Sequence, residues 1–334
     1  MPSSPLNPFR NLTRPVEPSE RVVRPAAMSM MSRSAALAAL VVVLAACSGS
    51  AASDTPTGSP AGSRGPSSGP SGASSSTPST VGAIEHKTGP TDVILRYDEG
   101  GGFVMPAYTA AQAPAFTLYG DGTLIFRPTQ VEPLPAVGSV EPFRPYRSAK
   151  MNEEQIQDLL DYALNEGGLG AARAEYTDMM VSDASTAVFT VNAGGLAKTV
   201  SVYALGFEAP EVPDLAIRQV LATLRKHLLD IDRGGTVKTD VYAPDRYRAI
   251  LLEGQAGAPD QKAWPWPAVK PAEFVSNGDP NAMPLPARVM TAAEIETLGI
   301  KPFEGGFIGL PLAGPGDGKF YTLSVRPLFP DDKS

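Results

Sequence analysis

Residues 48–80 restrict the fold more than any other part of the chain, because they cannot join a hydrophobic core. They are almost entirely Ser, Gly, Pro, Ala and Thr, and Asp54 and Arg64 are their only charged residues. Such a segment buries too little apolar surface to offset its ordering entropy. We therefore expect a disordered tether with a root-mean-square span of roughly 30 Å. Folded structure must come from the roughly 250 residues that follow, which suffice for one large or two small cores.

An apolar run precedes this tether. It extends from Ala35 to Ala46, follows Arg33 and ends at Cys47, the single cysteine of the chain. A membrane-spanning helix needs about 20 apolar residues, so this run is too short to be one. Its length and its basic flank are typical of the hydrophobic region of an export signal.

The end of the run, Leu44-Ala45-Ala46-Cys47, resembles the lipobox of bacterial lipoprotein precursors. The resemblance implies that the Cys47 thiol carries a diacylglycerol and that the chain is cut after Ala46. The expected location is the cell membrane, with the protein lipid-anchored and facing outside the cytoplasm. An ordinary secreted protein with a chance cysteine and a buried free cysteine are the alternatives. The Ser/Gly tract after Cys47 disfavours burial.

These features divide the chain into five parts. We expect residues 1–27 to be a mis-annotated extension or a long n-region, because Met28 and Met30 are better placed as starts. Residues 28–46 are expected to form the signal peptide, and 47–82 to hold the lipidated cysteine and its tether. An α+β subdomain at 83–235 and a Pro-rich subdomain at 236–334 follow.

Charge excludes two kinds of partner. The chain has a formal net charge of −7, and residues 1–46 carry five Arg and two Glu, so cleavage leaves a net charge of −10. An acidic domain lacks the basic surface that nucleic-acid binding requires. It also gains nothing from anionic lipid. Membrane attachment is therefore expected through lipidated Cys47 alone.

Hydrophobic periodicity predicts an α+β fold, with antiparallel β-hairpin sheets, two main amphipathic helices and one short helix. The helices are expected at 153–165, capped by Asn152, at 213–229, and at 291–298. Two hairpins are expected, at 116–126 and 185–205, and further strands at 93–97, 247–252 and 320–328. A two-lobed solute receptor built from βαβ units is the rival fold. Strands joined by two or three turn residues argue against it.

Candidate catalytic residues are scarce. The only histidines are His86, expected to be solvated at the tether's end, and His227, on the flank of a helix. Two histidines and one cysteine give no zinc site, and we predict no catalytic residue, metal or cofactor. The pair Asp331-Asp332 is interpreted as a solvated tail.

Trp264 and Trp266, separated by Pro265, are the only tryptophans and the candidate contacts for a ligand or partner. Aromatic faces displayed on a Pro-rich segment can stack on sugars or fill a groove. The alternative is that both rings cover the edge of a core.

Three functions remain open. The first is a membrane-anchored cell-envelope lipoprotein with a non-catalytic interaction or scaffold domain, whose partner is an envelope protein or glycan. The second is an extracytoplasmic protein that binds a sugar or small molecule. The third is a carboxylate-based envelope hydrolase, which needs two carboxylates roughly 5–10 Å apart in a cleft. Beyond the lipobox, the globular part resembles only uncharacterised exported lipoproteins.

Overall fold

A computed structural model of the chain describes residues 82–129, 134–177, 181–207, 210–276 and 284–333. The described residues all belong to one compact unit, 75–334. Cys47, Ala46, the segment expected to be a signal peptide and the segment expected to be a tether, up to residue 81, lie outside the described residues. The expected α+β class is confirmed, because helices accompany two mostly antiparallel sheets.

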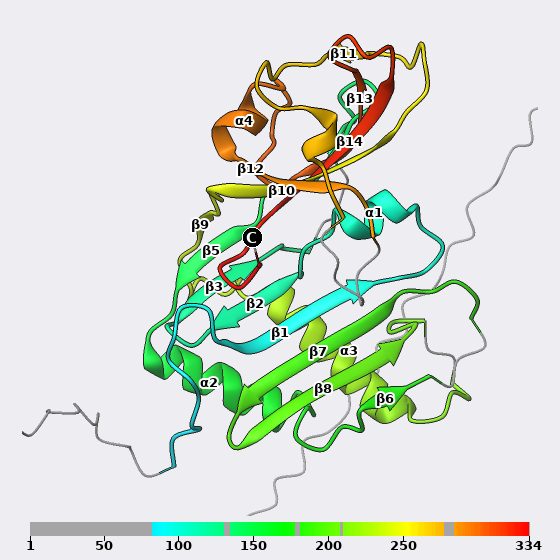
Figure 1. Cartoon of the computed structure of the whole chain (residues 1–334). Coiled ribbons are helices and arrows are strands. Elements are labelled where there is room, and N and C mark those ends of the chain that lie inside the picture. Colours follow the sequence, from blue (N-terminus) through cyan, green and yellow to red (C-terminus); the bar gives the residue numbers. More distant parts are fainter. Residues whose placement is uncertain (1–81, 130–133, 178–180, 208–209, 277–283, 334) are drawn as a thin grey trace, which may run out of the picture. The chain divides into compact units, whose positions relative to one another are not determined.

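The first sheet has eight strands in the order β6-β8-β7-β1-β2-β3-β5-β9 (Figure 1). Neighbouring strands are antiparallel except for β6 and β8, which are parallel. The two expected hairpins are β2–β3 and β7–β8. The strands are β1 (Val93–Gly100), β2 (Phe116–Tyr119), β3 (Thr123–Phe126), β5 (Arg147–Lys150), β6 (Glu175–Tyr176), β7 (Thr186–Ala193), β8 (Leu196–Tyr203) and β9 (Asp240–Val241).

Two long helices cover one face of this sheet. They are α2 (Glu153–Leu164) and α3 (Leu215–Leu229). The predicted capping box begins α2, since the Asn152 side chain accepts from the Gln155 amide and the Gln155 side chain accepts from the Asn152 amide. Apolar side chains of both helices pack against alternate residues of the strands in one core. Burying such a stripe is what stabilises an amphipathic helix.

The tight turn between β2 and β3 depends on glycine. Gly122 has a φ of +84°, and a Cβ added there would lie 2.3 Å from the Met151 carbonyl oxygen. Gly122 also accepts a hydrogen bond from the Met151 amide at 2.8 Å. The hairpin turn is thereby joined to the residue that precedes the cap of α2.

The second sheet has the order β11-β13-β14-β10-β12, and β4 pairs with β13 outside this path. Its cover is irregular, made of the Pro-rich loop, a 3-10 turn at Pro271–Glu273 and α4 (Ala292–Glu296). The strands are β4 (Glu141–Pro142), β10 (Arg246–Glu253), β11 (Lys262–Ala263), β12 (Ala287–Thr291), β13 (Phe307–Ala313) and β14 (Phe320–Pro327).

The chain changes sheet between β9 and β10, a few residues after the division expected near residue 235. Strand β4 is an exception to this division. It comes from the N-terminal half of the chain but belongs to the second sheet, where Pro142 pairs with Phe307. A further short helix, α1 (Pro106–Ala110), was not expected. It follows β1, and Tyr108 and Ala110 pack in a small core with Ile250 and Ile308 of the second sheet.

Candidate functional site

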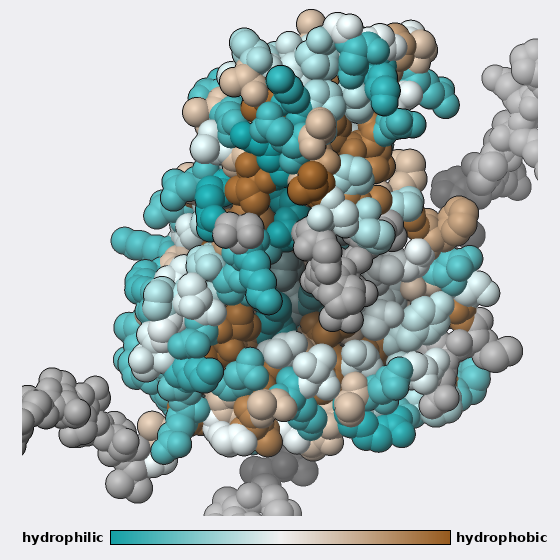
Figure 2. Space-filling view, in the orientation of Figure 1, coloured by the Kyte–Doolittle hydropathy of each residue, from teal (hydrophilic) through white to brown (hydrophobic). Residues whose placement is uncertain are grey.

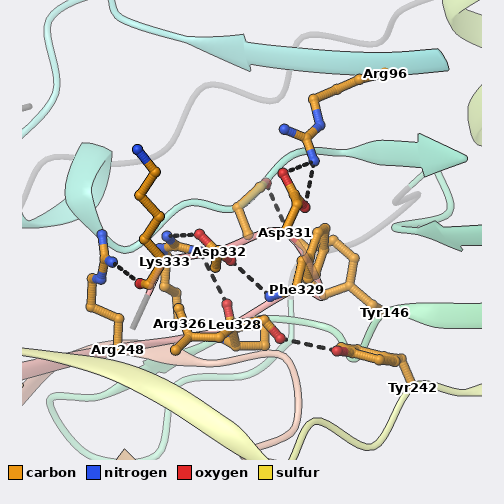
Figure 3. A network of polar contacts seen from close by, with 12 residues as sticks. Arg96, Tyr146, Tyr242, Arg248, Arg326, Leu328, Phe329, Asp331, Asp332 and Lys333 are labelled. Carbon is orange, nitrogen blue, oxygen red and sulfur yellow. Dashed lines mark hydrogen bonds and ion pairs between the residues drawn. The ribbon is translucent and has the colours of Figure 1, made fainter. Parts of the chain in front are cut away.

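The last residues of the chain form a polar and aromatic contact between the two sheets, which we call the C-terminal clamp (residues 328–333; Figure 3). Phe329 packs edge-on against Tyr146 and Tyr242, with ring centroids 5.0 and 5.8 Å away. It lies on the face of the first sheet that α2 and α3 leave free. Strand alternation explains this, since β2 turns Phe116 and Leu118 to the helices and Tyr119 to the clamp.

Carboxylates fix the clamp on both sides. Asp331 accepts two hydrogen bonds of 2.8 Å from one Arg96 nitrogen in β1, and one of 2.6 Å from the Tyr119 hydroxyl. Asp332 accepts from both terminal nitrogens of Arg326, at 3.0 and 2.7 Å, and from the Phe329 amide. Figure 3 shows the two carboxylates pointing in different directions, Asp331 to the first sheet and Asp332 to β14.

The expectation that Asp331 and Asp332 form a solvated tail is therefore wrong. Burial alone would raise the pKa of Asp332, but the Arg326 hydrogen bonds and charge hold it below its ordinary value. Both carboxylates already have protein donors, so the clamp acts as a structural joint between sheets. Sequence alone could not show this, because Arg96 and Asp331 are 235 residues apart.

The histidines have structural partners. His86 is not solvated as expected: its side chain is 4% exposed, and its Nε2 lies 3.2 Å from a Glu153 carboxylate oxygen. Its Nδ1 lies 2.7 Å from the Lys87 carbonyl oxygen. His227 stacks on Tyr162 at 4.2 Å, and burial lowers its pKa. His227 thus lies at the edge of the helical layer, as its helix position predicted.

The tryptophans belong to the core of the second sheet. Trp266 is 4% exposed and donates its indole N–H to the Glu294 carbonyl at 2.8 Å. Trp264 is half-buried, donates to the Val269 carbonyl at 2.8 Å, and meets the Trp266 ring edge-on. The rings therefore cover a core edge, which was the alternative reading. Their contact with a ligand stays a prediction.

A groove lies next to these rings. It has a volume of about 970 Å³ and runs between the end of β10, β14 and the Pro-rich loop. We call it the proline groove after Pro267, Pro271, Pro286 and Pro315, which line it. In Figure 2, brown apolar patches interrupt the teal surface in the upper part of the view, around β10 and β14.

Charged groups of both signs also line the proline groove: Glu253, Lys270, Asp317 and Lys319. The Tyr321 hydroxyl donates to Asp317 at 2.8 Å. Burial, this hydrogen bond and the charges of Asp317 and Glu253 raise the pKa of Tyr321 to about 12. The groove thus offers apolar walls together with donors and acceptors, which suits a polar organic ligand.

A second surface lies just after the end of β1, and we call it the apolar rim: Phe103, Val104 and Met105. Their exposed fractions are 90%, 43% and 67%. They are three of the eight large apolar residues that are exposed in the described parts of the chain. Sequence analysis missed this surface, although a signal existed: three apolar residues stand together between Gly100-Gly101-Gly102 and Pro106.

Comparison with protein-family models, with curated proteins and with solved structures gives no significant match. Within the described ranges, no helix has the length and hydropathy needed to cross a bilayer. Over the same ranges, no three His, Cys, Asp or Glu side chains are grouped so that they could hold a metal ion.

Proposed function

We propose that the protein is a lipid-anchored cell-envelope lipoprotein whose folded unit is a non-catalytic interaction domain. The lipobox at Leu44–Cys47 supports the anchor, and the tether after it supports a domain free to meet a partner. The apolar rim is the observation that carries the interaction role. Consecutive and exposed apolar residues such as Phe103, Val104 and Met105 are typical of a surface that binds another molecule.

The anchor is tested by metabolic labelling with an alkyne fatty acid. The wild-type chain should be labelled and sediment with membranes, whereas Cys47→Ala should lose both properties. Cys47→Ser is the matched control for thiol chemistry, since it keeps a nucleophilic oxygen of similar size. Fatty-acid labelling of Cys47→Ala would overturn the anchor.

The interaction role is tested by chemical cross-linking in whole cells. Wild-type protein should give one adduct of defined mass with an envelope protein. The Cys47→Ala variant should lose that adduct, because it no longer stays at the membrane. Equal adducts from both would show that the anchor does not bring the domain to its partner.

The proline groove favours a second candidate, an extracytoplasmic protein that binds a sugar or small molecule. Tyr321 lines the groove and its ring lies 5.9 Å from Trp264, so a bound ligand should alter tryptophan fluorescence. Titration with envelope oligosaccharides should give a saturable change that Lys270→Ala weakens. A carboxylate-based hydrolase remains a third prediction, because the carboxylates of Glu253 and Asp317 both line the groove. Incubating the protein with the same oligosaccharides and looking for cleavage products tests it.

A further inference from the structure

The lining of the proline groove restricts the kind of ligand that it can take. Among the described residues that line it, the only polar side chains are those of Tyr321 and of four charged residues: Glu253, Lys270, Asp317 and Lys319. Side-chain amides and aliphatic hydroxyls are absent from that lining. A neutral sugar has many hydroxyls, and each needs a donor or acceptor when it leaves water. The groove therefore suits a ligand with an apolar body and charged ends.

The floor of the proline groove accounts for the apolar body. Leu251, Val269 and Phe274 line the groove and are buried, and all three belong to the core of the second sheet. An apolar group that enters the groove therefore rests on this core. Its transfer out of water is favourable in proportion to the apolar area that it buries.

Two charged groups on opposite walls of the proline groove account for the charged ends. Glu253 is the last residue of β10 and pairs with Tyr321 of β14, whereas Lys270 lies in the Pro-rich loop. Both residues are exposed. Over the residues that the structure describes, the Glu253 carboxylate and the Lys270 ammonium have no hydrogen bond or ion pair, either with each other or with another group.

The other two charges of the groove compensate each other. Asp317 accepts hydrogen bonds from the Lys319 amide at 3.0 Å and from the Tyr321 hydroxyl at 2.8 Å. These two hydrogen bonds, together with the charge of Lys319, hold the pKa of Asp317 below its ordinary value. The groove thus keeps one negative group on the strand wall and one positive group on the loop wall for a ligand.

The loop wall is held in position before any ligand binds. The Val269 carbonyl accepts from the Trp264 indole at 2.8 Å, and the Lys270 amide donates to the Glu273 carboxylate at 2.9 Å. Proline on both sides, at Pro267 and Pro271, fixes the backbone φ angle there. A preformed site loses little conformational entropy on binding, which favours affinity.

We propose that the proline groove binds a short apolar peptide with free ends, whose carboxylate lies near Lys270 and whose ammonium lies near Glu253. A volume of about 970 Å³ exceeds what a single amino acid fills and lies at the upper end of the roughly 300–1,000 Å³ of ordinary ligand pockets. This inference rests on the second function proposed above, the binding of a small molecule by this groove, and it names the class of that molecule.

The first experiment is a calorimetric titration of the full-length, lipidated chain in lipid nanodiscs, with empty nanodiscs as the blank. The probe is the tripeptide leucyl-prolyl-phenylalanine, compared with its N-acetylated and its C-amidated forms. We expect saturable binding of the unmodified peptide. Either modification should weaken it about fivefold, because each removes one ion pair at an exposed site. Equal affinity for the three forms would overturn the proposal.

Substitutions of the two charged residues locate these effects. In Lys270→Met, amidation of the peptide should no longer weaken binding, and in Glu253→Gln, acetylation should no longer do so, because the partner of that end is gone. Lys319→Met is the matched control and should leave both effects in place, since Asp317 balances Lys319. An amidation effect that persists in Lys270→Met, or an acetylation effect that persists in Glu253→Gln, would contradict the inference.

A variant outside the groove tests the location of binding. Phe103→Ser changes the apolar rim and should bind the peptide as the wild-type chain does. Loss of peptide binding in Phe103→Ser would show that the peptide binds at the rim and that the groove inference is wrong.

The inference and the function on which it rests fail differently. If the envelope oligosaccharides bind and the peptide does not, the groove remains a ligand site and the peptide inference is wrong. If neither binds, the binding of a small molecule is itself wrong.

Discussion

The two sheets are covered in different ways. The first sheet is covered by α2 and α3, whose apolar residues recur with the helical period. The second is covered mainly by a Pro-rich loop, in which the indole N–H groups of Trp264 and Trp266 bind backbone carbonyls. In the first sheet many buried side chains share the stabilisation, whereas the cover of the second sheet depends on a few large side chains. We therefore expect a single substitution to lower the free energy of unfolding more when it removes one of the large side chains that cover the second sheet.

Trp266→Ala should have the largest effect. Removing a buried tryptophan costs about 3–5 kcal/mol of unfolding free energy, and here the Glu294 carbonyl also loses its donor. Leu160→Ala in α2 should cost about 2–5 kcal/mol, with less local disorder because neighbouring helical residues remain. Urea denaturation followed by tryptophan fluorescence and by circular dichroism measures both. Trp266→Phe, which retains most of the volume, is the control, and an equal loss in Trp266→Phe would show that packing is not the cause.

Breaking the clamp should test whether the two sheets unfold together. Arg96→Ala leaves Asp331 without its ion pair and should cost about 2–3 kcal/mol, because the pair is largely buried. Adding Asp331→Asn to Arg96→Ala should lower the free energy of unfolding little further, since the two residues act as a pair. If the sheets rely on the clamp, the variant will show two urea transitions in place of one. A single unshifted transition would contradict that role.

Asp332 gives the clamp a pH dependence. Asp332→Asn should cost about 1.5 kcal/mol at pH 7, since it removes charged hydrogen bonds to Arg326. The folded pKa of Asp332 lies below its ordinary value of 3.8, so its contribution is complete above that value and is lost as the pH falls through the folded pKa. Denaturation at several pH values should show wild type and variant converging in acid. A constant difference would contradict this.

Asp98→Asn should have the smallest effect on the free energy of unfolding, and it should raise that free energy where the other substitutions lower it. Burial raises the pKa of this carboxyl in β1, so its ionised form costs stability at neutral pH. Asp98→Asn stays neutral and keeps an acceptor for the Glu99 amide. We expect no loss and a gain of under about 0.5 kcal/mol at pH 7, measured by urea denaturation. Asp98→Ala, which removes the acceptor, is the control and should be destabilising.

The parts of the fold that sequence predicted are those with local signals. Capping residues and a 3.6-residue period gave α2, and the Asn152 cap was confirmed. Strand β13 was not predicted, because it contains Gly309 and Pro311, residues that usually interrupt a strand. The pairing with β14 shifts register between Phe307 and Leu310, which accommodates Gly309 at a φ of +85°.

The surfaces were harder to predict than the core. For Trp264 and Trp266 the structure supports the alternative interpretation, that both rings cover a core edge, and the neighbouring groove depends on Tyr321, far away in sequence. The clamp depends on pairs such as Arg96 and Asp331, which no local pattern reveals. The rim could have been predicted, because three apolar residues stand between Gly100-Gly101-Gly102 and Pro106, where turn residues are expected on both sides.

The C-terminal clamp also has a consequence for the order of biogenesis. Arg96 leaves the ribosome, and any export channel, long before Asp331, which follows it by 235 residues. Contacts between such distant residues form late in folding, because a long loop must close first. The joint between the sheets is therefore completed only after Asp331 has emerged. Until then the first sheet and its helices can pack, but the Arg96–Asp331 ion pair and the Phe329–Tyr146 contact that connect the two sheets are not yet made.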